Sequence, residues 1–266
     1  MHSGPDMLVI DDEEVILEAV THICSAEGIR TETAHDGATA LRSLERSPAR
    51  LVLCDIMMPE MDGFQVLEQI QKKFPETPVI ISTGFSTVEN AVRSLYAGAI
   101  DFIPKPFTAD ELLSAVSRGL RYRDLVLMHH PGADAEPGMF AVPCPPRYYR
   151  LGYMSWVVPE ADGTALIGIV HAFARTIDQI VGFDFVGEQE DIVQGIQCGR
   201  VRTFSGMTHN ILSPVSGKVL ERNPALEAEP HLVEKDPYFA GWLYRVIPSE
   251  PEYELAHLTP CGSGSV

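Results

Sequence analysis

Basic residues are scarce in this chain, which has 20 Lys and Arg against 37 Asp and Glu and a formal net charge of −17. Both halves share the deficit: residues 1–125 hold 20 acidic and 11 basic residues, and the remainder holds 17 and 9. A nucleic-acid-binding protein needs a basic face to neutralise phosphates, and neither half supplies one. We therefore expect no nucleic-acid partner.

Long apolar runs are missing as well. No stretch approaches the roughly 20 apolar residues that a membrane-spanning helix needs. The first residues, Met1–Asp6, lack the basic-then-apolar pattern of a secretory leader. We expect a cytoplasmic protein with no membrane partner.

Cysteine is rare and irregularly spaced. An odd number without CxxC or zinc-type spacing argues against both a disulfide framework and a metal knuckle. We expect reduced thiols, as is typical of the cytosol. The five are Cys24, Cys54, Cys144, Cys198 and Cys261.

The 266 residues, 45% of them hydrophobic, are enough for two domains with separate cores. Residues 6–125 alternate short apolar runs with helical patterns, which is typical of βαβ units and a parallel sheet. Five strands and five helices predict a doubly wound α/β domain. The expected strands are 7–10, 31–34, 51–54, 78–82 and 99–103, and the expected helices are 15–23, 38–44, 64–74, 87–96 and one beginning at the capping residue Thr108.

Residues 126–146 are rich in Pro and Gly and predict a linker, with the preceding helix extending to about Met128. His129 and His130 lie in it without matching ligands nearby, so a solvated pair is favoured over a metal fragment. Residues 147–266 predict a mostly β domain with one internal helix, Ala172–Ile180. Its expected strands are 153–158, 164–170, 192–203, 217–221 and 241–248.

Polar residues follow the apolar runs of the first domain. Because the carboxyl ends of parallel strands meet at one edge of a sheet, we expect them to converge. Clustered carboxylates need a positive partner, and an oxygen-only set suits Mg²⁺. The same charge would favour phosphoryl transfer, with a carboxylate as nucleophile and an amine and a hydroxyl contacting phosphate oxygens. The residues are Asp11, Asp12, Asp55, Thr83 and Lys105.

Each residue alone has a simpler interpretation. Asp12 could cap the following helix, Asp55 could begin a turn, and Lys105 could lie at the surface. Phe102 could be a static core aromatic. Because these residues occur together and in this order along the chain, we favour a functional site over the separate interpretations.

Four segments together resemble the receiver domain of two-component response regulators: Val9–Glu13, Asp55–Gly63, Ser82–Gly84 and Phe102–Phe107. The resemblance implies a flavodoxin-like (βα)5 fold with sheet order 2-1-3-4-5, and phosphorylation of Asp55 by a sensor histidine kinase. It further implies a Mg²⁺ site made by Asp12, Asp55 and the backbone carbonyl of Met57, with Asp11 assisting through water. Thr83 and Phe102 would form the switch pair that responds to phosphorylation.

Two apolar residues bear on the lifetime of the phosphorylated form. In receiver domains, positions two residues after the phosphoacceptor and after the switch hydroxyl can hold polar side chains that orient a hydrolytic water. Here these positions are Met57 and Phe85. We expect slow autodephosphorylation.

The segments Pro214–Val219, Asn223–Leu226, Pro230–Val233 and Asp236–Leu243 resemble the glycine cleavage system H protein. The resemblance implies a barrel-sandwich hybrid related to lipoyl domains. H proteins carry lipoate on a lysine several residues before the Pro-Val-Ser-Gly element, but residues 199–213 contain no lysine, and Ser205 or Gly206 stands in its place. We expect no lipoyl attachment and no lipoate.

Two other residues of this domain carry no chemistry in our interpretation. Lys218 lies past the Pro-Val-Ser-Gly element and is expected to be an ordinary strand or turn residue. His209 is a lone histidine and is expected to be a satisfied surface residue rather than a catalytic group.

We favour a response regulator, itself not an enzyme, whose H-protein-like output domain binds an unidentified protein partner. Phosphorylation would change domain docking or self-association, so we keep both a monomer and a homodimer as alternatives. Alternatives are a phosphorylation-regulated carrier or decoy of glycine-cleavage and lipoate metabolism, a hydrolytic output domain, and, with less support, a transcription regulator.

Overall fold

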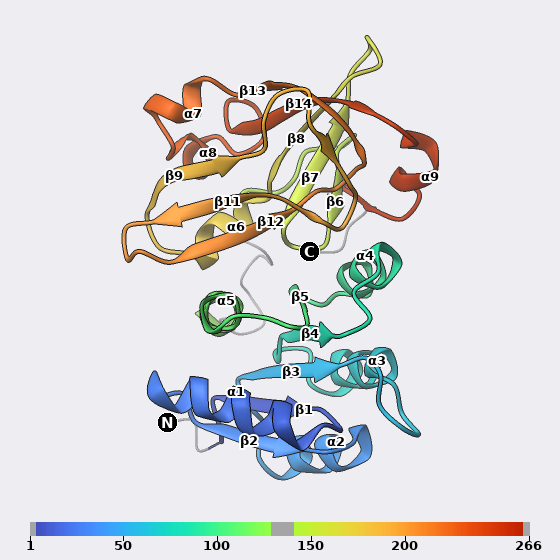
Figure 1. Cartoon of the computed structure of the whole chain (residues 1–266), viewed down its shortest axis with the longest axis vertical. Coiled ribbons are helices and arrows are strands. Elements are labelled where there is room, and N and C mark those ends of the chain that lie inside the picture. The colour runs from blue at the N-terminus through green and yellow to red at the C-terminus, as the bar shows by residue number, and fades with distance from the viewer. Residues whose placement is uncertain (1–3, 129–140, 263–266) are drawn as a thin grey trace, which may run out of the picture. The chain divides into compact units, whose positions relative to one another are not determined.

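A computed structural model of the chain describes residues 4–128 and 141–262, so the predicted roles of His129 and His130 lie outside the described residues. The chain divides into two compact units (Figure 1). Residues up to 86 and 97–128 form the first, whereas residues 87–96 are grouped with the second. Each unit is described by itself.

The first unit is built on a five-stranded parallel sheet in the order β2-β1-β3-β4-β5, as the sequence predicts. Right-handed crossovers place α1 and α5 on one face and α2 and α3 on the other. The elements are β1 (Met7–Ile10), α1 (Glu14–Ala26), β2 (Thr31–Ala34), α2 (Gly37–Arg46), β3 (Leu51–Asp55), α3 (Gly63–Lys73), β4 (Val79–Thr83), α4 (Val88–Tyr96), which connects β4 to β5, β5 (Asp101–Pro104) and α5 (Ala109–Met128).

Side-chain caps fix where these helices begin. Asp36 accepts from the Thr39 N–H at 2.7 Å at the start of α2. Asp62 and Gln65 form a complete capping box on α3, and Thr108 exchanges hydrogen bonds with Glu111 on α5. Because each cap satisfies N–H groups that a helix leaves unpaired, the short polar signals set the helix starts.

A buried ion pair joins α5 to β5. The Arg118 guanidinium lies 2.6 Å from Asp101 Oδ2 and also donates to the Ile100 carbonyl at 2.9 Å. The Arg118 side chain is only 3% exposed. Such a fully partnered pair fixes the position of β5, because either charge alone would be costly to bury.

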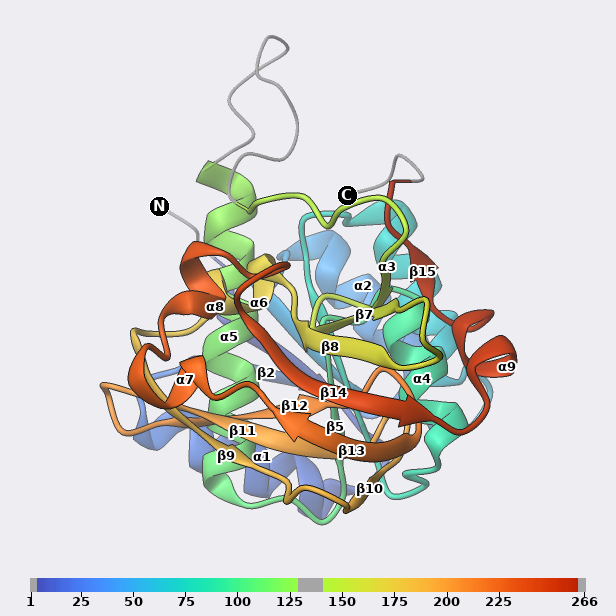
Figure 2. The ribbon, with the colours of Figure 1, turned by 90° about the horizontal axis from the view of Figure 1, so that it is seen from above.

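The second unit contains mostly antiparallel strands in two sheets, as predicted for a β domain. One sheet has the order β10-β13-β14-β8-β7-β6-β15 and the other has the order β12-β11-β9; Figure 2 shows β13, β14, β8 and β7 side by side. The strands are β6 (Tyr149–Leu151), β7 (Ser155–Pro159), β8 (Ala165–Ile169), β9 (Ile180–Phe185), β10 (Asp191–Ile192), β11 (Gln197–Thr203), β12 (Thr208–Leu212), β13 (Gly217–Arg222), β14 (Trp242–Pro248) and β15 (Thr259–Pro260), and the helices are α6 (His171–Thr176), α7 (Ala225–Ala228), α8 (Leu232–Lys235) and α9 (Pro251–Leu255).

Two sequence predictions for this unit need correction. The helix expected over 172–180 ends at Thr176, because Ile180 begins β9 and pairs with Thr203 of β11. The single strand expected over 192–203 is two strands in different sheets. Gly195 lies between them with φ +73°, a left-handed conformation that turns the chain from one sheet to the other.

The expectation of five reduced thiols is wrong for two of them. Cys144 and Cys261 form a disulfide with a Cα–Cα distance of 5.6 Å, across a sequence separation of 117 residues. The other three, Cys24, Cys54 and Cys198, are free and buried, as expected.

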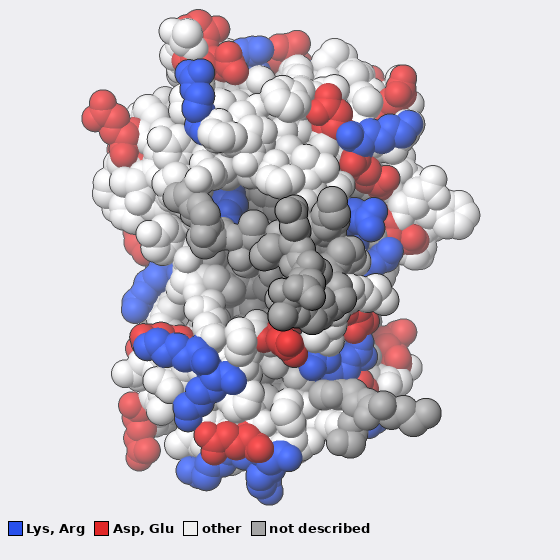
Figure 3. All heavy atoms as spheres, turned by 180° about the vertical axis from the view of Figure 1, so that it is seen from behind, with Lys and Arg blue, Asp and Glu red and all other residues white. Residues whose placement is uncertain are grey.

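On the face drawn in Figure 3, basic and acidic side chains are interspersed rather than gathered by sign. Within residues 4–128 and 141–262, no helix combines the length and apolar character needed to cross a membrane.

Candidate phosphoacceptor site

The carboxyl ends of the central strands bring the predicted residues together at one edge of the sheet. Ile10 pairs with Cys54, and Asp55 pairs with Ser82, so β1, β3 and β4 end nearly level. Residues that directly follow or end these strands therefore meet. Asp11, Asp55 and Lys105 form one hydrogen-bonded cluster, as the parallel topology predicts.

Lys105 is the centre of the cluster. Its ammonium lies 2.6 Å from Asp11 Oδ2 and 3.0 Å from Asp55 Oδ1, and the three side chains are 9%, 4% and 5% exposed. The Lys105 backbone N–H also donates to the Thr83 carbonyl at 2.8 Å. The ammonium is therefore held between two buried carboxylates and is not a surface side chain.

Each carboxylate uses its second oxygen to bind the backbone. Asp55 Oδ2 accepts from the Met57 N–H at 2.6 Å, and Asp11 Oδ1 accepts from the Glu13 N–H at 3.1 Å. Asp55 therefore does more than begin a turn, because its other oxygen faces Lys105. These bonds fix both carboxylates in orientation, which a phosphoryl acceptor requires.

The pKa values of Asp11 and Lys105 depend on two opposing effects, which are burial and the pairing of opposite charges. Burial raises the pKa of Asp11, because the hydrogen bonds and charge of Lys105 offset only part of the lost solvation. For Lys105, burial alone would lower the pKa, but the hydrogen bonds to Asp11 and Asp55 outweigh it and the pKa is raised. Lys105 therefore stays protonated at neutral pH.

The loop after β3 closes tightly on the end of that strand. The Gly63 N–H donates to the Ile56 carbonyl at 2.9 Å, and a Cβ at Gly63 would lie 2.2 Å from the Asp55 backbone oxygen. Only glycine allows this approach without displacing the backbone of Asp55. Gly63 is thus a requirement of the site that its turn-like sequence context did not reveal.

The predicted switch pair is buried. Thr83 has no exposed surface, and its hydroxyl accepts from the Phe85 N–H at 3.2 Å. Phe102, 7% exposed, lies on β5. A turned-in aromatic suits both interpretations of Phe102, as a switch and as a static core residue, so its switch role stays a prediction.

Asp12 is not part of the cluster. It is exposed, and among residues 4–128 and 141–262 no three His, Cys, Asp or Glu side chains are grouped to hold a metal ion. The observed cluster instead has two carboxylates neutralised by an amine. The four-member ligand set with Asp12 and the Met57 carbonyl therefore stays a prediction.

The second unit presents a hairpin where an H protein would carry its lysine. The turn between β11 and β12 contains Ser205, whose N–H donates to Asp178 Oδ2 at 3.1 Å, and Gly206, whose φ is +85°. Phe204 on this turn is 77% exposed. Lys218 lies on β13, opposite Asp191, and not at a hairpin tip.

His209 differs from its sequence prediction. It is 3% exposed on β12, opposite Val201, and is therefore a core residue rather than a surface residue. The prediction was wrong because residues 208–212 were not identified as a strand, whose alternation turns His209 inward. Its buried position gives no support to a catalytic role.

Comparison with known proteins agrees with this geometry. Residues 7–117 match the family described as response regulator receiver domain, and residues 147–260 match the glycine cleavage H-protein family. Both resemblances drawn from the sequence motifs are confirmed.

Several known proteins are similar to part of this chain. Regulatory protein AtoC of Escherichia coli is 37% identical over 119 residues, which cover 45% of this chain and 26% of AtoC. Response regulator MprA of Mycobacterium avium is 35% identical over 130 residues, covering 49% and 54%. The crystal structure of the receiver domain of NtrX from Brucella abortus has 42% identity, covers 43% of this chain and 98% of that one, and has a TM-score of 0.42. This chain thus spans about a quarter of AtoC and about half of MprA.

Proposed function

Because the chain joins a response regulator receiver domain to a glycine cleavage H-protein domain, we propose that it is a two-component response regulator phosphorylated on Asp55 by a sensor histidine kinase. The observation that carries the proposal is the position of Lys105, whose ammonium bridges Asp11 and Asp55. The proposal places the chain in the cytoplasm, where such kinases present their phosphohistidine.

The residues of the cluster suit phosphoryl transfer. Asp55 Oδ1 would attack the phosphorus of a phosphohistidine, the P–N bond would break with its electron pair going to the ring nitrogen, and the imidazole would leave with a proton taken from solvent. Lys105, already 3.0 Å from that oxygen, would donate to a phosphoryl oxygen as charge develops. The Thr83 hydroxyl, at the end of β4, would bind another phosphoryl oxygen. The backbone N–H of Met57 would keep Asp55 oriented throughout.

Receiver domains generally bind Mg²⁺, and the donors present here fit that ion. Two carboxylates and a nearby backbone carbonyl are oxygen ligands, and Mg²⁺ usually keeps several waters beside one or two carboxylates. Asp11, Asp55 and the Met57 carbonyl would hold it, with Asp12 joining from its exposed position. When bound, the ion neutralises charge on the acceptor and on the incoming phosphoryl group.

The H-protein-like domain is, in this proposal, an output domain that binds a protein partner without lipoate. Its hairpin offers Ser205 and Gly206 where attachment requires an amine. A decoy that occupies a partner of true H proteins is the second candidate, favoured by the same lysine-free hairpin. The second part of the chain gives no support to a transcription regulator, because residues 126–266 hold 17 acidic and 9 basic residues and residues 147–260 match an H-protein family.

Phosphorylation is tested with acetyl phosphate and Mg²⁺, with the product followed by phosphate-affinity electrophoresis. Wild type should be labelled and Asp55→Asn should not. Asp62→Asn is the matched control, because it removes a neighbouring carboxylate while asparagine still caps α3. Labelling of Asp55→Asn at the wild-type level would refute the proposed acceptor.

The absence of lipoate is tested by intact mass after coexpression with a lipoate ligase. Wild type should remain unmodified, whereas Ser205→Lys supplies an amine at the hairpin and serves as the positive control. A lipoyl group on Lys218 or Lys235 of wild type would instead establish a carrier.

A further inference from the structure

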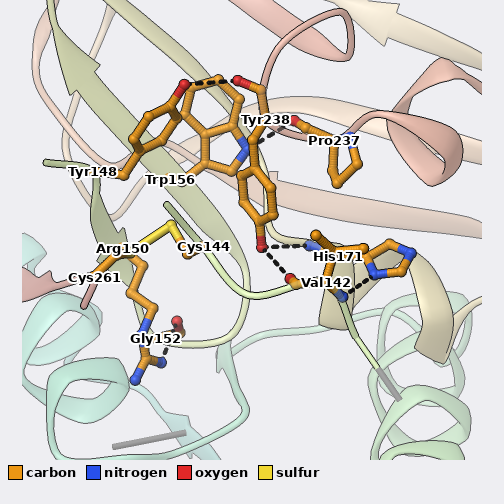
Figure 4. The surroundings of a disulfide bond; sticks show 10 residues. All are labelled: Val142, Cys144, Tyr148, Arg150, Gly152, Trp156, His171, Pro237, Tyr238 and Cys261. Carbon is orange, nitrogen blue, oxygen red and sulfur yellow. Dashed lines mark hydrogen bonds between the residues drawn. A yellow bond between two sulfur atoms is a disulfide. The ribbon is translucent and has the colours of Figure 1, made fainter. Parts of the chain in front are cut away.

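The segment of residues 141–148, which we name the strap, is the first described stretch after α5 and leads into β6. It contains three prolines, Pro143, Pro145 and Pro146, which have no N–H to donate to a strand ladder. The strap therefore cannot be held by regular strand pairing. Its attachment to the second unit depends on a few individual contacts (Figure 4).

Two side chains hold the start of the strap. The Val142 N–H donates to His171 Nδ1 at 2.6 Å, and the Tyr238 hydroxyl donates to the Val142 carbonyl at 3.1 Å. At the other end, the Tyr148 hydroxyl donates to the Tyr238 carbonyl at 2.8 Å. Figure 4 shows these groups around the strap.

The single covalent attachment lies between these contacts. Cys144 of the strap is bonded to Cys261, which directly follows β15. The Cys261 N–H also donates to the Tyr148 carbonyl at 2.8 Å, and β15 pairs with β6 through only two residue pairs. The disulfide thus links the strap to the segment that follows β15. Because both segments have few hydrogen bonds, this covalent bond contributes much of what holds them in place.

Accessibility separates this pair from the other cysteines. Cys144 and Cys261 are half-buried, whereas Cys24, Cys54 and Cys198 are buried. Burial raises the pKa of all three free thiols, to about 11 for Cys24 and about 12 for Cys198. Buried thiols of high pKa react slowly, so thiol chemistry concentrates on the pair that solvent reaches.

We propose that Cys144 and Cys261 form a reversible redox site that exchanges with a protein dithiol and thereby fastens or frees the strap. The inference goes beyond phosphorylation but rests on the cytoplasmic location in the proposed function, since disulfides there are usually transient or redox-sensing. It gives the chain a second input that does not pass through Asp55.

The chemistry is thiol–disulfide exchange. A thiolate of the dithiol attacks one sulfur of the pair, the Cys144–Cys261 bond breaks, and a mixed disulfide forms. The second thiol of the dithiol then attacks that mixed disulfide. The products are two cysteine thiols in this chain and one oxidised dithiol, so two electrons and two protons move to Cys144 and Cys261.

Reduction leaves the strap with a few partly exposed hydrogen bonds. Once these open, residues 141–148 are no longer held against the rest of the second unit. Tyr148 also leaves the Trp156 ring, which it contacts at a centroid distance of 5.1 Å. Trp156 is fully buried, so its exposure is a convenient optical signal of strap release.

The test is hydrogen exchange of the native full chain, oxidised and then treated with dithiothreitol, combined with maleimide labelling. Treatment should label Cys144 and Cys261 together and leave Cys24, Cys54 and Cys198 unlabelled as internal controls. Exchange at Val142 and Cys261, whose N–H groups donate to His171 Nδ1 and to the Tyr148 carbonyl, should rise at least tenfold, with altered emission from Trp156 in a Trp242→Phe background. The Cys144→Ser variant should exchange fast with or without the reductant.

A pair that resists dithiothreitol until the domain unfolds would overturn the proposal and leave a structural cross-link. Reduction without faster exchange in the strap would overturn it equally. Should Cys144→Ser fail to fold, Cys261→Ser and the in situ reduction of wild type give the same readout. Acetyl phosphate labelling of Asp55, measured on the same samples, reports on the proposed function separately.

Discussion

Lys105 and Asp11 are 94 residues apart in the chain, yet the ammonium of one lies 2.6 Å from a carboxylate oxygen of the other. Lys105 follows β5 and Asp11 follows β1, and parallel pairing puts both strand ends at the same edge. The same ammonium holds Asp55, so one side chain sets both the charge balance and the geometry of the site.

Replacement of Lys105 should leave two buried carboxylates without a counter-charge. We expect Lys105→Met to lower the free energy of unfolding by about 3 kcal/mol in Mg²⁺-free buffer. Added Mg²⁺ should then stabilise the variant more than wild type, because the ion replaces the missing charge. Urea denaturation with and without Mg²⁺ measures both effects.

Lys72→Met is the control for that experiment. Lys72 pairs with Glu68 on the surface of α3, where both side chains are more than 60% exposed. Its loss should cost less than about 0.5 kcal/mol and should not respond to Mg²⁺. An equal Mg²⁺ response in the two variants would contradict the assignment of the ion to the Asp11–Asp55 cluster.

The raised pKa of Asp11 predicts a pH dependence of stability. Because the folded chain binds this proton more tightly than the unfolded chain, Asp11 favours folding below its ordinary pKa of 3.8, and this contribution is lost as pH rises through the folded value. In Mg²⁺-free buffer, Asp11→Asn should therefore gain stability relative to wild type as pH rises from acid to neutral. Thermal unfolding of both proteins across pH measures their difference in stability. A difference that does not change with pH would contradict a raised pKa of Asp11.

Gly63 should be intolerant of a side chain. A Cβ there would lie 2.2 Å from the Asp55 backbone oxygen. We therefore expect Gly63→Ala to lower the free energy of unfolding by about 1–3 kcal/mol and to impair acetyl phosphate labelling. Gly84 is the matched control beside the same site, because a Cβ there meets nothing within 4 Å. Equal stabilities of the two alanine variants would show that the close approach is not required.

The phosphorylated form should be long-lived. Met57 and Phe85 are 52% and 61% exposed next to the site and offer no hydrogen bond from their side chains to a hydrolytic water. Wild type should lose phosphate over minutes to hours in Mg²⁺ buffer, and Met57→Asn should shorten the half-life several-fold. A wild-type half-life of seconds, measured by phosphate-affinity electrophoresis, would contradict this account.

The parts of the fold that sequence could predict have local causes. Asp36, Asp62 and Thr108 are short polar residues directly before helices, and their caps place α2, α3 and α5 where the pattern indicates. Continuous apolar runs mark buried parallel strands, and parallel topology then brings Lys105 to Asp11 and Asp55. The cluster was therefore predictable although its members are far apart in sequence.

The parts that sequence missed depend on distant partners. Residues 177–180 continue a helical spacing, but pairing with β11 makes Ile180 a strand residue. β6 and β15 are short strands at one end of their sheet, with little pattern to detect. The Cys144–Cys261 bond depends on a Cα–Cα distance that spacing along the chain cannot supply. His209 was misplaced because its strand was missed.

Chemical trapping of the phosphorylated residue tests the central claim most directly. Borohydride reduces an aspartyl phosphate to homoserine, which peptide mass spectrometry locates after treatment of the full chain with acetyl phosphate and Mg²⁺. The account predicts homoserine at position 55 and none without acetyl phosphate. Homoserine at position 11, 12 or 62, or phosphate retained on a histidine with Asp55 intact, would contradict it.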